Sequence, residues 1–473
     1  MVDGRELAAQ FENAADFETR KVLCGGQLLT VLFLDGLTSG GDIAEQVVRP
    51  LAQMTDEARE EVLFTRALQG GVWCASVKEP ESTQQAAELL VNGFCVILFP
   101  KSGKALGCEV KTGEKRSPSP PETENTVKGA KDAFTETLRT NTSLVRRHLR
   151  TPGLRLTETV VGKRTLTKVT VCWIDRLTDP ELPRRMQERL SSIDIDGALS
   201  PAAIEEYVTG SRRTAFPLLE YTERTDHFCQ GLLDGQVGLL ADGLPLGYLA
   251  PVGLGRLMRS PEDRATDFFS ASMLRLLRYA ALGVSLLLPA LYAAMAMFHQ
   301  QMLPTKLLLS IIESKQNVPF STLLEVLGLL CAFELLQQAG LHLPQAVGTA
   351  VSIIGGLGGG TAAVDAKLVS PAALIVTASS GICGFTLPNR ELSDAVRLWR
   401  FVLTVLAGLW GLFGVTVGLL LLLTELAGLE SLGRSYLSPF GRAEVKGALV
   451  RPRLVRQKWR DGALKPMDDQ NQR

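Results

Sequence analysis

The strongest constraint on the fold is a stretch of twenty residues, 279–298, that contains no charged side chain. A helix needs about 20 mainly apolar residues to cross the hydrocarbon core of a bilayer, so this segment is long enough to span a membrane. Residues 368–387 and 401–424 are also free of charge, and residues 345–364 are apolar but rich in glycine. Because four such stretches fall in one half of the chain, we predict a helical polytopic transmembrane domain over residues 279–427.

Positive charges flank this predicted membrane domain. Five arginines stand close before the first stretch, namely Arg256, Arg259, Arg264, Arg275 and Arg278, and residues 434–473 carry ten Lys or Arg against four Asp or Glu. Lys and Arg accumulate on the cytoplasmic side of membrane proteins, so both flanks are expected in the cytosol and the number of crossings should be even. A fifth crossing at residues 321–338 would place the basic tail outside, and we therefore interpret that segment as partly inserted or re-entrant. The four-span arrangement puts Arg390, Arg397 and Arg400 on the outer side, against the same rule.

The first half of the sequence alternates helical periodicity with short apolar strands, such as residues 27–34 and 94–99, and this predicts an α/β domain over residues 1–110. Several prolines without apolar periodicity follow, and we assign residues 111–130 to a linker. A second α/β domain is predicted over residues 131–278, where Asp242 and Gly243 form the turn signal of a hairpin between strands at 237–240 and 246–249. Residues 428–473 form a basic cytosolic tail. The predicted fold class is thus α/β cytosolic domains followed by an α-helical polytopic transmembrane domain.

Composition argues against several classes of function. Lys plus Arg and Asp plus Glu both total 50, so there is no overall charge that would attract nucleic acid. The four histidines lie outside metal-binding and nucleophile motifs, and no two of the eight cysteines form a Cys-x-x-Cys pair. We therefore expect no enzyme, no cofactor, no metal site and no nucleic-acid partner.

Two carboxylates, Glu325 and Glu334, stand in an otherwise apolar stretch. A carboxylate at membrane depth is costly unless it faces a bundle interior or water, so both are candidates for an ion pathway. On a helix they would lie on opposite sides and ~13 Å apart along the axis. An amphipathic helix at the membrane surface, with polar residues at both ends, explains the same pattern.

Glycines are concentrated at residues 355–360, where Gly355, Gly356 and Gly359 contribute to Gly-xxx-Gly pairs. Small residues at this spacing let helices pack closely in lipid, and Gly414 and Gly418 repeat the pattern. A broken helix beside a pathway is a second interpretation, because membranes permit irregular backbone next to protein or water. A dinucleotide site is disfavoured, since no strand precedes the run and no acidic residue follows it at the required spacing. We count the first three glycines and Pro388, a possible hinge, among the gating candidates.

A series of short segments in a fixed order resembles one known family, the GerA-type A subunits of spore germinant receptors. The segments include Asp194-Ile-Asp-Gly197, Phe216-Pro-Leu218, Thr222-Glu-Arg-Thr-Asp226, Leu287-Leu-Pro-Ala-Leu-Tyr292, Phe298-His-Gln-Gln-Met-Leu-Pro-Thr305, Val369-Ser-Pro371 and Tyr436-Leu-Ser-Pro-Phe440. Single segments are weak signals, but their order is specific. The family pattern has proline where this chain has Thr225 and an aromatic residue where it has Arg264, and residues 1–105 match least.

The resemblance implies a membrane subunit of the spore inner membrane, which acts with B-type and C-type subunits and converts nutrient binding into germination. It also implies a homo-oligomer in the lipid bilayer that forms a gated ion pathway. A sporulation paralogue that assists the release of ions or small molecules is an alternative within the same family. A secondary transporter ranks lower, because no internal repeat relates the apolar segments.

Overall fold

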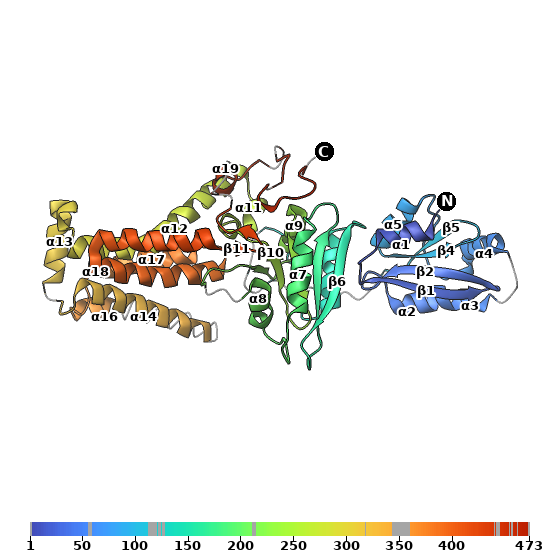
Figure 1. Cartoon of the computed structure of the whole chain (residues 1–473), viewed down its shortest axis with the longest axis horizontal. Helices are drawn as coiled ribbons and strands as arrows, with labels where there is room; N and C mark the ends of the chain where they lie inside the picture. The colour runs from blue at the N-terminus through green and yellow to red at the C-terminus, as the bar shows by residue number, and fades with distance from the viewer. Residues whose placement is uncertain are drawn as a thin grey trace.

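The computed structural model shows three parts in a line: an N-terminal domain, a second domain and a helical bundle (Figure 1). It describes residues 2–471 except 55–58, 112–120, 122–123, 125–127, 211–213, 317, 343–359, 439, 441–444, 454, 456 and 461. We call residues 2–111 domain 1, residues 128–266 domain 2 and residues 268–428 the bundle. The predicted order of two α/β domains followed by membrane-type helices is confirmed. Most of the predicted linker lies outside the described residues.

Domain 1 is a five-stranded antiparallel sheet with helices on both faces. Its strand order is β1-β2-β4-β5-β3, with β1 at Phe17–Cys24, β2 at Gln27–Leu34, β3 at Val77–Lys78, β4 at Phe94–Phe99 and β5 at Lys104–Glu109. Gly25 and Gly26 take positive φ angles of 53° and 75° in the tight turn between β1 and β2, a conformation that glycine adopts without steric cost. The predicted strands at 27–34 and 94–99 are confirmed.

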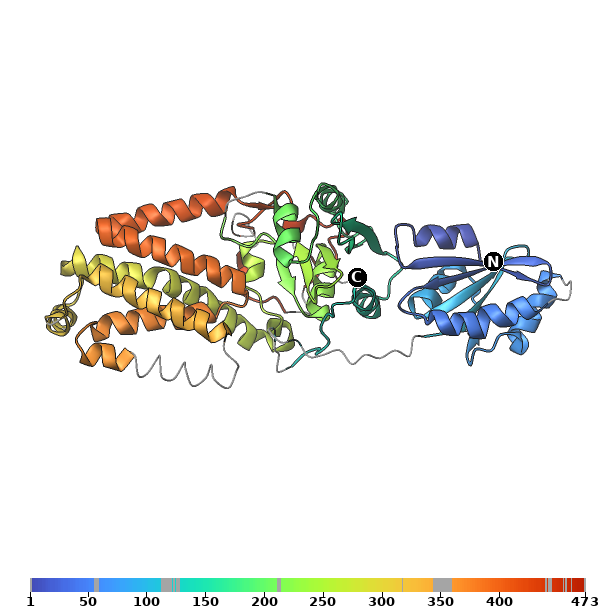
Figure 2. The ribbon, with the colours of Figure 1, turned by 90° about the horizontal axis from the view of Figure 1, so that it is seen from below.

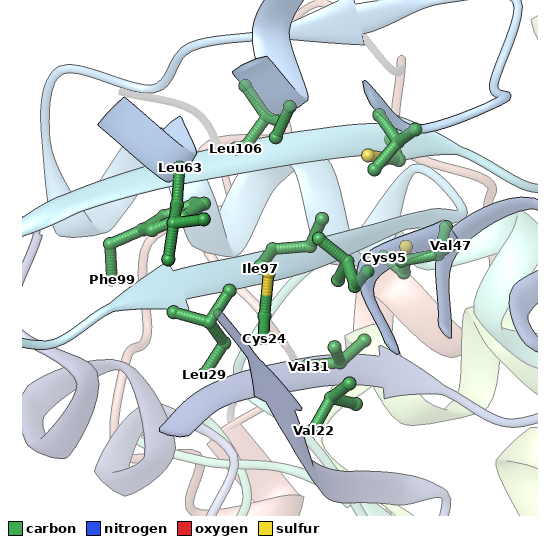
Figure 3. Close-up of a cluster of buried hydrophobic side chains, with 14 of the residues drawn as sticks. Val22, Cys24, Leu29, Val31, Val47, Leu63, Cys95, Ile97, Phe99 and Leu106 are labelled. Carbon is green, nitrogen blue, oxygen red and sulfur yellow. The ribbon is translucent and has the colours of Figure 1, made fainter. Parts of the chain in front are cut away.

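Alternate residues of this sheet build two separate cores. Val31, Ile97 and Leu106 face one core, which Figure 3 shows, and pack against α3 (Arg49–Gln53), α4 (Glu60–Arg66) and two irregular helical turns at Ile43–Val48 and Ala67–Gly71. Residues on the opposite face pack against α1 (Gly4–Gln10) and α5 (Thr83–Val91). Every residue of β4 is buried, which explains its unbroken apolar sequence, because a strand covered on both faces needs no polar alternation.

Domain 2 repeats this plan with the strand order β6-β7-β9-β10-β8. The strands are β6 (Leu154–Val161), β7 (Thr167–Ile174), β8 (Glu220–Thr222), β9 (Val237–Ala241) and β10 (Gly247–Ala250). Helices α6 (Leu138–His148) and α9 (Thr225–Asp234) cover one face, and α7 (Glu181–Ser191) and α8 (Pro201–Thr209) cover the other. The predicted hairpin around Asp242 and Gly243 is confirmed as β9 and β10. Two short helices, α10 (Leu254–Leu257) and α11 (Glu262–Ala265), lead into the bundle.

A buried ion pair joins domains 1 and 2. Arg146 of α6 donates from Nε and Nη2 to the two carboxylate oxygens of Asp16, both at 2.7 Å, and the two side chains are only 1% and 2% exposed. Beside them Ala15 N–H donates to the carbonyl oxygen of Leu156 on β6 at 2.8 Å. The two domains therefore meet through a bidentate pair and a main-chain contact, which fixes their relative position better than a surface contact would.

The bundle contains α12 (Phe268–Met297), a 3-10 turn (Gln300–Met302), α13 (Thr305–Lys315), α14 (Thr322–His342), α16 (Gly360–Asp365), α17 (Pro371–Phe385) and α18 (Arg390–Gly428). Three helices are long and apolar enough to cross a membrane, at Phe268–Met297, Thr322–Gly340 and Arg390–Gly428, and α17 is a shorter apolar helix. We call the end of the bundle beside domain 2 its near end. The end that carries α13 is the far end (Figures 1 and 2).

The 39-residue α18 is a helical hairpin. Gly411 interrupts it with φ 63° and ψ −142°, a region that only glycine occupies readily. The two arms, 390–410 and 412–428, run back alongside each other (Figure 2). A Cβ at Gly414 would lie 2.0 Å from the carbonyl oxygen of Leu406 on the other arm, and Gly418 packs against Leu403. The predicted close packing at these glycines is thus confirmed, but within one hairpin.

This hairpin corrects the predicted membrane topology. Residues 401–424 do not form a single crossing, because Gly411 turns the chain back at the far end beside Phe298 and His299, which follow α12. Residues 322–338 belong to a continuous helix of 21 residues that is long and apolar enough to cross a membrane. The interpretation of this segment as partly inserted or re-entrant stays a prediction. The predicted crossing at 345–364 lies almost entirely outside the described residues. Both ends of α18 now lie at the near end, and Arg390 is therefore on the same side of the bundle as the arginines that precede α12.

The chain after the bundle returns to domain 2. A two-stranded ribbon of β11 (Glu430–Ser431) and β12 (Arg434–Ser435) lies against it. Ser431 Oγ donates to the Leu218 carbonyl at 2.6 Å, and Arg434 pairs with Asp179. Further along, α19 (Val445–Leu449) and a 3-10 turn (Gly462–Leu464) follow, and Met467 N–H donates to the Leu177 carbonyl at 2.8 Å. The predicted tail is therefore folded onto domain 2 where it is described.

Candidate functional site

A single buried arginine forms the polar centre of the bundle. Arg400, on the first arm of α18, is 1% exposed. Its Nη2 donates to Oε1 of Glu334 on α14 at 2.7 Å, and its Nη1 donates to Oγ of Ser380 on α17 at 3.2 Å. Ser380 in turn donates to the carbonyl oxygen of Ser285 on α12 at 2.7 Å. One guanidinium group thus connects four helices.

The charge of Glu334 is balanced inside the bundle. Besides Arg400, Arg397 places its Nη1 3.6 Å from the second carboxylate oxygen, and the same group lies 3.0 Å from Asp394. Two guanidinium groups therefore surround one carboxylate that is 21% exposed. Such a group stabilises the arrangement of helices, and its attraction for a free cation is reduced by the arginines. The role of Glu334 in ion passage stays a prediction.

Glu325 has a different environment. It lies in the first turn of α14 and is 2% exposed. One of its carboxylate oxygens accepts a hydrogen bond from the main-chain N–H of Ser370, the residue that caps the start of α17. The other oxygen is 4.0 Å from the Nζ atom of Lys315, at the end of α13. This carboxylate sits at the far end of the bundle with one partly exposed positive partner.

The two predicted glutamates share helix α14 but belong to separate clusters, because nine residues advance a helix by ~13 Å. Gly355, Gly356 and Gly359 lie outside the described residues. Pro388 is exposed in the short turn between α17 and α18, at the near end. Its position beside the start of a hairpin is compatible with a hinge, and the gating role of all these residues stays a prediction.

A cavity of about 710 Å³ lies where domain 2 meets the bundle. It is lined by α8, by residues 214–219 and by the first turn of α18, with four carboxylates in Glu205, Glu206, Glu391 and Asp394. Burial raises the pKa of Glu205, and the neighbouring charge of Glu206 adds to this effect. Sequence reasoning missed this cavity, because its walls come from segments far apart in the chain.

Carboxylates in domain 2 hold the arginines that precede α12. Glu220 accepts hydrogen bonds from His227 Nε2 at 2.8 Å and Arg256 Nε at 2.7 Å, and Arg256 Nη1 also donates to Asp234 at 2.9 Å. Burial acts to raise the pKa of Glu220, but the positive charges of Arg256 and His227 lower it to about 2. Arg275 of α12 pairs in the same way with the buried Asp263 of α11 at 3.0 Å. These pairs fix the near end of the bundle to domain 2.

A histidine, an aspartate and a threonine meet in domain 2 without forming a nucleophile relay. Nε2 of His148 lies 2.7 Å from Oδ2 of Asp132 and 3.2 Å from Oγ1 of Thr225. A relay needs the two ring nitrogens of the histidine to face the nucleophile and the carboxylate separately, whereas here one nitrogen faces both. Within the described residues, no group of three or more His, Cys, Asp or Glu is arranged to hold a metal ion.

Comparison with known sequences decides the family. The profile of the family described as "Bacillus/Clostridium GerA spore germination protein" matches residues 5–466. The chain belongs to the GerA family. This confirms the resemblance drawn from the short segments, and it places the chain in the family of germinant receptor A subunits, which is involved in spore germination.

Several GerA relatives match along most of their length. "Uncharacterized membrane protein YfkQ" of Bacillus subtilis (strain 168) is 35% identical over 92% of this chain and 84% of its own length. "Spore germination protein KA" of the same organism is 33% identical over 94% and 83%. "Spore germination protein A1" is 30% identical over 92% and 89%. A solved structure of the N-terminal domain of the A subunit of the Bacillus megaterium spore germinant receptor GerK3 covers 52% of this chain and 92% of its own, with 23% identity and a TM-score of 0.42.

Thr225 stands where the resemblance drawn from the sequence implies a proline in the family pattern. The structure shows what the threonine does: its hydroxyl donates to Asp132 Oδ2 at 2.5 Å. That bond ties the start of α9 to the segment before α6. A proline at this position would remove both the hydroxyl and a backbone donor.

Proposed function

We propose that this chain is the A subunit of a nutrient germinant receptor in the inner membrane of the spore, and that it is not an enzyme. The observation that carries the proposal is the match to the GerA family over residues 5–466. The three membrane-type helices and the name of the relative YfkQ as a membrane protein support a location in a membrane. The His148 cluster, which lacks the geometry of a relay, is in keeping with a non-catalytic role.

Domains 1 and 2 and the tail are proposed to lie in the cytosol. The hairpin of α18 supports this orientation, since it moves Arg390 to the near end together with the arginines before α12 and the basic tail. All these positive charges then satisfy the rule that favours Lys and Arg on the cytoplasmic side. The far end, with α13, faces the opposite side of the membrane.

The bundle is proposed to contribute to a gated cation pathway in a homo-oligomer, together with B-type and C-type receptor subunits. Exposed apolar side chains on α14, such as Leu324 at 60% and Leu335 at 71%, provide surface for other subunits or for lipid. The carboxylate of Glu325 is the better candidate for attracting a cation, because among the described residues it has one positive partner, the amine of Lys315. Arg400 and Glu334 instead hold the four helices in register.

Deletion of the gene in the parent organism tests this function. Spores that lack the chain should lose nutrient-triggered potassium release, and an unlinked copy of the gene should restore it. Tagged chain should purify from spore membranes together with B-type and C-type subunits. Normal nutrient responses in the deletion strain, with each tested nutrient, would contradict the receptor role.

A sporulation paralogue is the second candidate, and one observation favours it: the relative YfkQ, at 35% identity, carries no germination name. In that case the deletion would leave nutrient responses intact but alter the release of ions or small molecules during sporulation or germination. Genes for B-type and C-type subunits beside this one would favour the receptor. The absence of such neighbours would favour the paralogue.

A further inference from the structure

The end of α13 places an amine beside the buried carboxylate of the far end. Nζ of Lys315 lies 4.0 Å from Oε2 of Glu325 and donates a hydrogen bond to Oγ1 of Thr322. The lysine side chain is 23% exposed, while that of Glu325 is fully buried at 0%. The positive charge therefore reaches the carboxylate from the surface of the bundle.

The two oxygens of Glu325 have different partners. Oε1 accepts the main-chain N–H of Ser370. Oε2 is buried and accepts no hydrogen bond from the described residues, although it is the oxygen that faces Lys315. Buried acceptors in proteins almost always accept a hydrogen bond. Because Oε2 accepts none from the described residues, it can interact with a positively charged ligand.

We propose that Glu325 and Thr322 form a binding site for a monovalent cation, and that the ammonium group of Lys315 occupies it in the closed state. An ammonium group carries one positive charge, as potassium and sodium ions do, and both kinds of ion bind to oxygen ligands. The lysine is thus a tethered cation that excludes free ones. This inference rests on the proposed cation pathway.

Helix α13 makes few buried contacts with the rest of the bundle, which allows it to move. Of its apolar side chains only Ile311 is buried, whereas Leu307, Leu309 and Ile312 are 49%, 60% and 43% exposed. A helix with so little buried surface can shift without disturbing the packing of α12, α17 and α18. Movement of α13 would withdraw Lys315 and leave the Glu325 carboxylate free for a potassium or sodium ion.

The test compares Lys315→Gln with Lys306→Gln in otherwise normal spores. Lys306 lies on the same helix, is exposed, and has no ion pair among the described residues, so it controls for the loss of a positive charge. Potassium released from dormant spores without nutrient is measured with an ion-selective electrode. We expect about tenfold faster release from the Lys315→Gln spores, a factor that corresponds to ~1.4 kcal/mol in the balance of closed and open states. Lys306→Gln and Lys315→Arg should match the wild type.

Glu325→Gln separates failure of this inference from failure of the pathway. We expect this variant to reduce nutrient-triggered release, and the double variant with Lys315→Gln to lose the leak of the single lysine variant. If Glu325→Gln spores release potassium normally on nutrient addition, the pathway itself is contradicted. If Glu325→Gln is impaired but Lys315→Gln spores release potassium as slowly as the Lys306→Gln control, the pathway stands. The proposal that Lys315 occupies the cation site is then overturned. Immunoblots of spore membranes check the amount of each variant, and Lys315→Met serves as a second variant if Lys315→Gln accumulates poorly.

Discussion

Replacing Glu334 by alanine should destabilise the bundle more than replacing Arg400 by methionine, although the two side chains form one ion pair. Arg400 is 1% exposed, so Glu334→Ala leaves a buried guanidinium without its closest carboxylate. Breaking a buried pair in this way costs ~3–5 kcal/mol. Arg400→Met removes the buried charge instead, and leaves a glutamate that is 21% exposed with Arg397 at 3.6 Å. We expect that change to cost only ~1–2 kcal/mol.

The assay is the temperature at which the full-length chain in detergent loses its monodisperse peak in size-exclusion chromatography. The expected order of midpoints is wild type, then Arg400→Met, then Glu334→Ala. The double variant should be more stable than Glu334→Ala alone, because it no longer contains an unpaired buried charge. A double variant that is less stable than both single variants, or a larger loss for Arg400→Met, would refute this account of the bundle.

Three further predictions concern the domain contact, the hairpin and pH. Arg146→Ala leaves the buried carboxylate of Asp16 without its partner and should weaken the contact between domains 1 and 2 by ~3–5 kcal/mol. The expected result is faster proteolysis of the chain between the two domains. Gly411→Ala should cost more than the ~1–3 kcal/mol of backbone strain and lower the amount of chain in the membrane, because its Cβ would also lie 2.8 Å from Cε1 of the His299 ring. The hydrogen bond that protonated His148 donates to the carboxylate of Asp132 raises the pKa of His148 above its ordinary value of 6.5. This pair therefore stabilises fully below pH 6.5, and the contribution is lost as pH rises through the folded pKa. His148→Gln should flatten the thermal stability profile above about pH 6.5.

Each of these predictions has a matched control. Arg147→Ala removes a neighbouring exposed arginine and should leave proteolysis unchanged; equal effects of the two substitutions would contradict the buried pair. Gly283→Ala places a methyl group where nothing lies within 4 Å, and it should accumulate normally. For the histidine, a profile of the variant that falls with pH as steeply as that of the wild type would show that the pair does not set the pH dependence.

Local sequence signals predicted the soluble domains well. The strand at 94–99 is an apolar run that both faces of the sheet bury, and the Asp242–Gly243 turn lies in the hairpin that it predicts. These features depend on neighbours in the sequence. Hydrophobic periodicity and the residue types of turns were therefore sufficient to predict them. The same holds for the first membrane helix, whose charge-free segment lies almost wholly within α12.

Contacts between distant segments were not predictable in this way. Gly411 looks like any other glycine in an apolar run, and its turn depends on the close packing of the two arms and of the end of α12. Arg146 stands in a cluster of positive residues, which gives no local sign of burial, and its partner Asp16 is 130 residues away. Glu334 was recognised as a costly intramembrane carboxylate, but the arginines that balance it lie on another helix, assigned to the outer side by the four-span model.

The most direct test of the receptor account is potassium flux through the assembled complex. The chain is purified with its B-type and C-type subunits, reconstituted into potassium-loaded lipid vesicles, and challenged with a mixture of free amino acids and sugars that triggers germination of the parent spores. We expect efflux that starts on addition of the mixture and is strongly reduced in vesicles carrying Glu325→Gln. Equal efflux from vesicles made with and without this chain would contradict a cation pathway through its bundle.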